Sequence, residues 1–184
     1  MKKAQRVRAL SALLSRLESR DFDRREHALF ELAVMLRRAN QRAADDDPLS
    51  AAELPRELSR IRLTLDEQRI VADRLLQLAV SRRDSRASAV WAMSESAANA
   101  GWESILRLLD ECGEQLTGEA AFQACRALRL WLASGELSGE MIRRAMALGS
   151  LTSLLGIWSQ AGDARLKRAA QDVLDSLHSA TPLG

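Results

Sequence analysis

The chain has 184 residues, a formal net charge of +2 and no tyrosine, and it is long enough for one domain that buries its apolar residues without metals or disulfides. The near balance of charges excludes a protein that binds nucleic acid over its whole surface, and the scarcity of aromatic residues disfavours β-sheets. No apolar run approaches the roughly 18 residues of a membrane span, and arginines interrupt the first apolar segment, unlike in a signal peptide. We therefore expect a single all-α domain over 1–184 that does not enter the membrane and resides in the cytoplasm.

The first two predicted helices differ in how many faces they can bury. Apolar residues recur at three- and four-residue steps over 4–19, which predicts an amphipathic helix with one buried face. A second helix, starting near Asp23 and ending near Asn40, is apolar on two faces and should have neighbours on both sides. The connection over 41–55 is acidic and bracketed by prolines, which predicts a mobile surface loop.

A short helix is expected over 56–63, followed by a longer one whose start is marked by a capping box. In that motif Thr64 and Glu67 satisfy backbone amides reciprocally, and the helix that they open should reach Arg82. The next helix, over 85–100, is unusually rich in alanine and serine. Such small side chains let neighbouring helices approach closely.

Glycines separate the helices expected in the rest of the chain, which cover 101–113, 119–134, 138–148, 151–160 and 164–179. Gly113 has the position of a left-handed helix C-cap, since a glycine has no Cβ to oppose that conformation. Gly135 stops the following helix. The last helix, over 164–179, is apolar on one side only, which is typical of the capping element of a repeat stack.

The second helices of successive units can be superimposed on four alanines. Ala28, Ala89, Ala124 and Ala170 then occupy equivalent positions, at intervals of 61, 35 and 46 residues. These intervals scatter around the roughly 40-residue unit of two- and three-helix repeats, and the first is lengthened by the acidic connection and the short helix. The register predicts about four repeats and roughly ten helices.

With this register the chain resembles the armadillo and HEAT repeat families. The unit over 148–177 is closest to armadillo, with a leucine-rich helix, a Gly-Asp corner and a helix containing Leu-x-x-x-Ala. The resemblance implies a right-handed α-α superhelix with a groove that binds an extended peptide. Armadillo grooves carry the stretch Trp-Ala-Leu-Ser-Asn, which Trp91-Ala92-Met93-Ser94-Glu95 matches except at its last position. Glutamate lacks the paired donor and acceptor of the asparagine amide, so that family's peptide preference does not follow.

The residues that the resemblance and the register assign to the groove are Phe30, Trp91, Glu95 and Arg126. The position of Trp91 is taken in the last repeat by Asp172, and the asparagine position elsewhere is taken by apolar or small residues, so the armadillo ladder is not intact. Trp91 is either a groove residue or a large residue packed against small helix faces. The other tryptophans are expected in or near the core: Trp102, Trp131 and Trp158.

Arginines suggest a second surface. Those at a helix junction and on later helices could form a basic strip for phosphates or acidic segments: Arg82, Arg83, Arg86, Arg126, Arg129, Arg143 and Arg144. The alternative interpretation is a solvated ladder, because Arg25, Arg86 and Lys167 occupy the position at which HEAT-like repeats stack basic side chains against neighbouring acids.

Residues for catalysis are sparse. His27 and His178 lie near opposite ends of the chain with no third residue to orient either as a base. Cys112 and Cys125 are isolated thiols in apolar helical context, and neither a metal-ligand spacing nor a glycine-rich phosphate loop occurs. We expect no enzyme, no cofactor and no metal.

Three functions follow, in order of preference. The first is a non-catalytic adaptor or scaffold whose groove holds a protein or peptide partner. The alternative is nucleic-acid binding by the arginine strip, with affinity that falls steeply with salt. The third is a HEAT-like base-excision or chromophore-attaching enzyme, for which Glu95 near Trp91 is the one candidate carboxylate.

Overall fold

The computed structural model describes residues 3–40 and 53–180, and all regular structure in these residues is helical, as the composition predicts. The α-helices are α1 (Lys3–Arg16), α2 (Phe22–Ala39), α4 (Arg56–Ser59), α5 (Leu65–Ser81), α6 (Arg86–Ser94), α7 (Ala98–Cys112), α8 (Gly118–Ser134), α9 (Gly139–Met146), α10 (Gly149–Trp158) and α11 (Ala164–Ala180). A 3-10 turn, η1 (Gly113–Gln115), follows α7. Most of the loop predicted over 41–55 lies outside the described residues.

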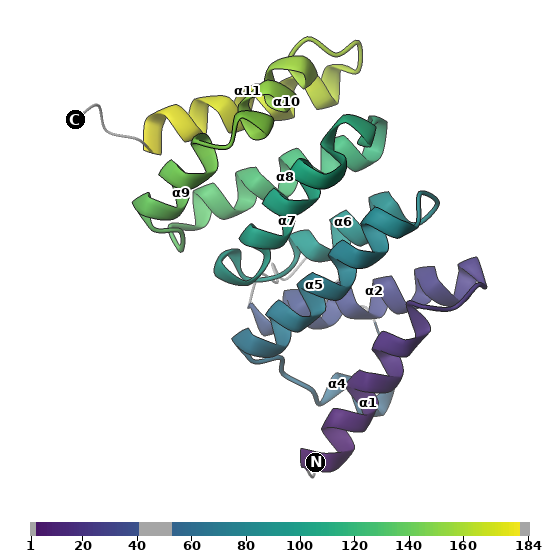
Figure 1. Ribbon diagram of the computed structural model, residues 1–184. Helices are drawn as coiled ribbons and strands as arrows, with labels where there is room; N and C mark the ends of the chain where they lie inside the picture. The colour runs from purple at the N-terminus through teal and green to yellow at the C-terminus, as the bar shows by residue number, and fades with distance from the viewer. Residues whose placement is uncertain (1–2, 41–52, 181–184) are drawn as a thin grey trace.

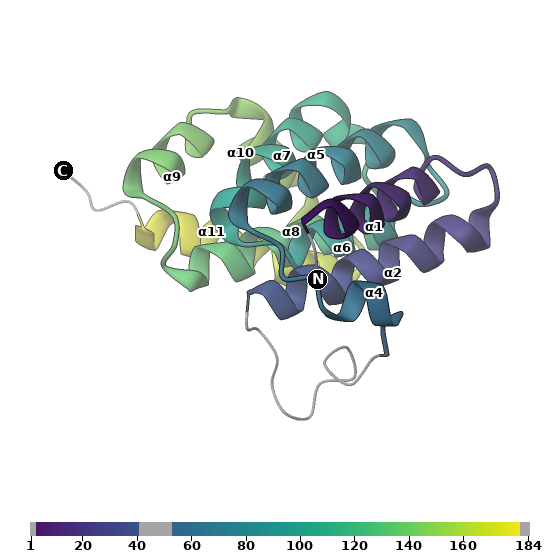
Figure 2. The ribbon, with the colours of Figure 1, turned by 90° about the horizontal axis from the view of Figure 1, so that it is seen from below.

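The helices form two layers (Figures 1 and 2). Helices α2, α6, α8 and α11 pack side by side in that order and form the α2 layer. Helices α5, α7 and α10 pack in order in the other layer, the α1 layer, with α1 beyond α5. Each of the pairs α1–α2, α5–α6, α7–α8 and α10–α11 is consecutive among these helices and in contact across the layers. Helix α9 packs against α10 and α11, and α4 packs against α1.

Small residues occupy the equivalent position on each helix of the α2 layer. The four alanines that align the repeats, Ala28, Ala89, Ala124 and Ala170, are all completely buried. Each has only a methyl group, so neighbouring helices can pack against it at short range. Helix α6, which carries Ala89, contacts both α2 and α8.

The capping box predicted at the start of α5 is confirmed. The Glu67 amide donates to Thr64 Oγ1 at 3.3 Å, and the Thr64 amide donates to Glu67 Oε2 at 2.8 Å. The helix ends at Ser81, with Arg82 as its C-cap. The preceding short helix stops at Ser59, sooner than predicted, although the apolar residues after it still point into the core.

Glu67 also pairs with Arg6 of α1, and it gives the fold a measurable dependence on pH. Burial raises the pKa of the Glu67 carboxyl, but the hydrogen bonds from Thr64 and Arg6 outweigh burial and hold the pKa below its ordinary value. The folded state therefore favours the carboxylate, whose contribution is complete above the unfolded pKa of about 4.3 and is lost as the pH falls through the folded pKa. Glu67→Gln should lower the free energy of unfolding by about 1 kcal/mol near neutral pH.

Urea unfolding at several pH values checks this expectation. The difference between Glu67→Gln and wild type should shrink as the pH falls below about 4, because the wild-type carboxyl is then protonated. A difference that stays constant with pH would show that the ionised form of Glu67 contributes nothing.

The prediction of a single helix over 85–100 is wrong, because the chain turns between Ser94 and Ala98. Two serines favour the break, since Ser94 Oγ donates to Trp91 O and Ser96 Oγ donates to Met93 O, both at 2.7 Å. Hydroxyls bonded to the preceding backbone carbonyls compete with a continuing helix. Tertiary contacts described below then satisfy the backbone of the turn.

Two glycines behave differently from one another. Gly135 ends α8 in the left-handed conformation, at φ +71°, which suits a residue without a Cβ. Gly113 was expected to do the same after α7, but it is right-handed, at φ −55°, and continues into the 3-10 turn. A Cβ at Gly113 would lie 2.2 Å from a methyl group of Leu154 of α10, which would have to shift to make room for it.

Helix α11 ends the α2 layer. It buries one side, which carries Leu166, Ala170 and Val173, against the body of the protein, and it leaves Arg168 and Gln171 exposed. No helix in the described part of the chain is long and apolar enough to cross a membrane.

Candidate functional site

The residues assigned to the groove lie together on the α2 layer. Phe30, Trp91, Arg126 and Asp172 each stand two residues after one of the four buried alanines, on four successive helices of that layer. Because these helices pack side by side, the four positions form a row across the layer, which we call the surface row. Phe30 and Trp91 belong to α2 and α6, and Arg126 belongs to α8.

Phe30 and Trp91 form the apolar end of the surface row. Their rings are stacked, with centroids 6.4 Å apart and an interplanar angle of 25°. Phe30 is 37% exposed and Trp91 is partly buried, so Trp91 is not one of the fully buried tryptophans. A stacked aromatic pair that is partly open to solvent is a surface that can accept an apolar side chain.

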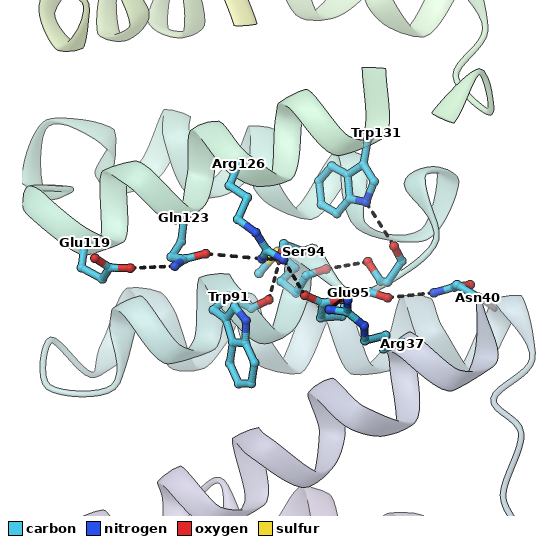
Figure 3. A network of polar contacts seen from close by, with 11 residues as sticks. Arg37, Asn40, Trp91, Ser94, Glu95, Glu119, Gln123, Arg126 and Trp131 are labelled. Carbon is cyan, nitrogen blue, oxygen red and sulfur yellow. Dashed lines mark hydrogen bonds and ion pairs between the residues drawn. The ribbon is translucent and has the colours of Figure 1, made fainter. Parts of the chain in front are cut away.

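Glu95 lies beneath the row and is not part of an open groove. Its side chain is 2% exposed, and its carboxylate accepts from Arg37 Nη1 at 3.2 Å and from Arg126 Nη2 at 3.0 Å (Figure 3). Arg126 Nη1 also donates to Ser94 Oγ at 2.8 Å. The carboxylate thus joins α2 to α8, and it positions the Arg126 guanidinium at the surface. The assignment of Glu95 as a groove-lining residue is corrected to a positioning role.

The backbone around Glu95 is satisfied by side chains from other helices. Asn40 Nδ2 donates to the carbonyl of Glu95 at 2.8 Å, and the Ala97 amide donates to Gln68 Oε1 at 2.8 Å. Trp131 Nε1 donates to the Ser96 carbonyl at 3.1 Å. Side chains from the C-cap of α2, from α5 and from α8 therefore converge on the turn between α6 and α7, and Figure 3 shows Asn40 and Trp131 among them. This convergence fixes the end of α6, and with it the position of Trp91.

The three tryptophans expected in the core are buried there: Trp102, Trp131 and Trp158. Trp102 and Trp131 meet edge to face, with ring centroids 6.4 Å apart. A Cβ at Gly101 would lie only 2.6 Å from the Trp131 ring, so this position in α7 requires glycine. The core behind the surface row is closely packed.

The structure does not bring the predicted basic strip together. Arg86 is 5% exposed, and its guanidinium donates to the carbonyls of Ala79 at 2.7 Å, Val80 at 3.3 Å and Gln115 at 3.4 Å. The first two carbonyls belong to the C-terminal end of α5 and the third to the turn η1, so Arg86 is a buried capping residue and not a surface cation. The assignment of Arg86 to the strip is wrong.

The remaining arginines of the strip are exposed but dispersed. Arg82 and Arg83 follow α5, whereas Arg143 and Arg144 lie on α9, at the opposite edge of the molecule (Figure 1). Arg129 of α8 lies 3.6 Å from Asp172 of α11. These side chains do not form one continuous patch.

Arg25 plays the same part as Arg86 one repeat earlier. It is 1% exposed, pairs with Asp84, and donates to Ser85 Oγ at 3.2 Å and to the Ser19 carbonyl at 2.9 Å. Both arginines link the turn before their own helix to the next turn along the stack. The interpretation of a solvated ladder is therefore wrong for Arg25 and Arg86. Of the three residues assigned to the ladder, only Lys167 is exposed.

The sequence-based assignment missed a pocket between α8 and α11. Two arginines from each helix line it: Arg126 and Arg129 from α8, and Arg165 and Arg168 from α11. The pair on α11 was not assigned a role. The signal was present in the sequence, because each pair has the three-residue spacing that places both side chains on one helix face.

The candidate catalytic groups remain apart. His27 is exposed, with its Nε2 3.4 Å from Glu31 Oε1, and His178 is exposed on α11. Both cysteine thiols are free and buried, and burial raises the pKa of Cys125 to about 12 and that of Cys112 above its ordinary value. Within residues 3–40 and 53–180, no three His, Cys, Asp or Glu side chains could hold a metal ion together.

Comparison of the chain with protein-family models and with curated protein sequences finds no match. The surface row, its supporting glutamate and the arginine pocket are therefore the observations that bear on function.

Proposed function

We propose that this protein is a non-catalytic binding module, an adaptor or scaffold, that holds a segment of a partner protein on the surface of its α2 layer. The observation that carries the proposal is the stacked pair of the exposed Phe30 and the partly buried Trp91, in one row with the Arg126 guanidinium. Tryptophan and arginine are enriched among the residues that dominate binding energy at protein interfaces. The row offers both, at neighbouring positions.

The pre-organisation of this surface supports the same function. Glu95 and Ser94 fix the Arg126 guanidinium, and the buried turn after α6 fixes the helix that carries Trp91. Side chains that are already held in place lose less conformational entropy when a partner binds. This arrangement favours a rigid docking surface over one that orders only on binding.

The proposal includes the architecture. We interpret the two-layer stack as a short right-handed superhelix of about four armadillo- or HEAT-like repeats, with the α2 layer lining its groove. The equivalent buried alanines and the equivalent roles of Arg25 and Arg86 support this interpretation, since both features recur at the repeat interval.

A selection experiment tests the function. Random peptides displayed on phage would be selected on the immobilised protein, and the affinities of selected peptides would be measured for wild type and for Trp91→Ala. Truncation of a central aromatic residue costs about 2 kcal/mol, so we expect affinity to fall by about 30-fold. The change lies in the dissociation rate constant, because the surface row retains its shape in the free protein.

Ile70→Ala is the matched control. Ile70 is 54% exposed on α5, in the other layer, so its removal also deletes an exposed apolar side chain. Affinity should stay within about twofold of wild type, because a side chain outside the interface contributes little to binding. Peptides that bind Trp91→Ala as tightly as wild type, or that depend on Ile70 instead, would refute the assignment of the surface row.

Nucleic-acid binding remains the second candidate, because four guanidiniums surround one pocket. Its signature is an affinity for a single-stranded oligonucleotide that falls steeply as salt is added, since each phosphate contact releases counterions.

A further inference from the structure

The pocket between α8 and α11 is a shallow hollow of about 270 Å³ at the end of the surface row. Its charged lining consists of Arg126, Arg129, Arg165, Arg168 and Asp172. Four guanidiniums therefore face one carboxylate. Carboxylates outside the lining also pair with these arginines, since Glu95 pairs with Arg126 and both Glu119 and Asp163 pair with Arg165. The positive charge that these ion pairs leave unbalanced is that of Arg168.

Two of the four guanidiniums have partners that leave donors available, and Arg126 is the more firmly held of the two, because its side chain is 26% exposed and that of Arg165 is 65% exposed. Arg126 is bonded to Glu95 and Ser94 from below. Arg165 lies over the Phe122 ring, with its guanidinium carbon 5.1 Å from the ring centroid. A cation above an aromatic face is oriented by the ring quadrupole and keeps its N–H groups directed outward in the ring plane of the guanidinium.

The other two guanidiniums are weakly engaged. Arg129 lies 3.6 Å from Asp172, and both side chains are substantially exposed, so this pair contributes little. Arg168 makes no ion pair with any residue of the described part of the chain, and it is exposed. Both can turn toward an incoming anion without loss of a strong interaction.

A second hollow lies beside Trp91 of the aromatic pair. It is lined by Trp91, Glu119 and Gln123, together with small residues of α6. Glu119 also pairs with Arg165 at 3.3 Å, and Gln123 Oε1 lies 3.5 Å from Arg126 Nη1. The hollow beside Trp91 and the arginine pocket are therefore neighbours along α8, linked by these two contacts.

We infer that the arginine pocket is the subsite for an acidic side chain, so that the partner segment pairs an apolar residue at Phe30–Trp91 with a glutamate or aspartate near Arg168. This inference rests on the proposed function and specifies its ligand. An arginine fork matches a carboxylate in two parallel hydrogen bonds. An acidic peptide is favoured over a nucleic acid because Glu119 and Asp172 interrupt the basic surface, and successive phosphates would meet these carboxylates.

The test uses the peptides selected on the full chain. They should be enriched in acidic residues near an apolar one, and Arg168→Glu should lower their affinity by about fivefold or more. Replacing the peptide's acid by its amide should weaken binding to wild type by a similar factor and should not weaken binding to Arg168→Glu further. Arg144→Glu, the same charge reversal at an exposed site on α9, is the control for net charge and should leave affinity within about twofold.

The outcomes separate the two proposals. Peptides that depend on Trp91 but not on Arg168 or on their own acids would overturn the acidic subsite and leave the proposed function standing. Failure to select any peptide that depends on Trp91 would overturn both. Binding of a single-stranded oligonucleotide that depends on Arg168, with no peptide bound, would show that the pocket takes phosphates and would also overturn the inference.

Discussion

Glu95→Ala is expected to lower the free energy of unfolding by about 3–5 kcal/mol, because it removes a buried carboxylate that two guanidiniums share. Glu95 is 2% exposed in its side chain, and Arg37 and Arg126 are 18% and 26% exposed. When one partner of a buried ion pair is removed, the charge of the other partner remains buried and poorly hydrated. The free-energy cost of that unpaired charge exceeds the stabilisation that the intact pair provides. Urea denaturation followed by circular dichroism measures the change.

Glu103→Ala is the matched control, since Glu103 is exposed on α7. It should change stability by no more than about 0.5 kcal/mol, as is usual for surface substitutions. If Glu95→Ala also cost less than about 1 kcal/mol, the carboxylate would not be what joins α2 to α8. Its supporting role under the surface row would then have to be abandoned.

Trp131→Ala is the second substitution with a large expected effect, a loss of about 3–5 kcal/mol. Trp131 is completely buried, packs edge to face on Trp102 and donates from its indole to the Ser96 carbonyl. Its removal leaves a cavity beside Gly101 and an unsatisfied carbonyl in the turn after α6. Thermal and urea unfolding measure the loss.

Trp91→Ala provides the comparison for Trp131→Ala, because the same residue type is truncated at the surface. Trp91 is only partly buried, so we expect a loss of about 1–2 kcal/mol and an intact fold. Equal losses for the two substitutions would contradict the distinction between a core tryptophan and a binding tryptophan, on which the functional assignment depends.

Local signals in the sequence were sufficient to predict most of the fold. Helical periodicity and the capping box at Thr64 each depend on residues a few positions apart, and the structure confirms both. The burial of Trp102 and Trp131 also follows from apolar helix faces. The surface row was found because a repeat register converts positions far apart in sequence into neighbours.

The errors share a different cause, since each depends on a contact that is distant in sequence. Arg86 was expected at the surface because charged side chains are rarely buried, but the carbonyls at the end of α5 supply enough acceptors to bury it. Glu95 is buried for an equivalent reason, with Arg37 and Arg126 as its partners. The helix boundary after Ser94 was missed because side chains from three other helices stabilise the turn.

The arginine pocket could not be recognised from one helix alone. The acidic partners of Arg126 and Arg129 lie outside α8, on Glu95 and Asp172, and the cluster of four guanidiniums arises only where α11 adds Arg165 and Arg168. Spacing within each helix was visible in the sequence, but the relative rotation of the two helices was not.

The central claim, that the α2 layer binds the partner segment at Trp91, is tested most directly by the indole signals of the tryptophans in a ¹⁵N–¹H correlation spectrum. The chain has four tryptophans, of which Trp102, Trp131 and Trp158 are buried. Titration with a selected peptide should shift the Trp91 indole signal, assigned by its absence in Trp91→Ala, and leave the other three nearly unchanged. A Trp91 signal that stays in place at saturation would contradict the account.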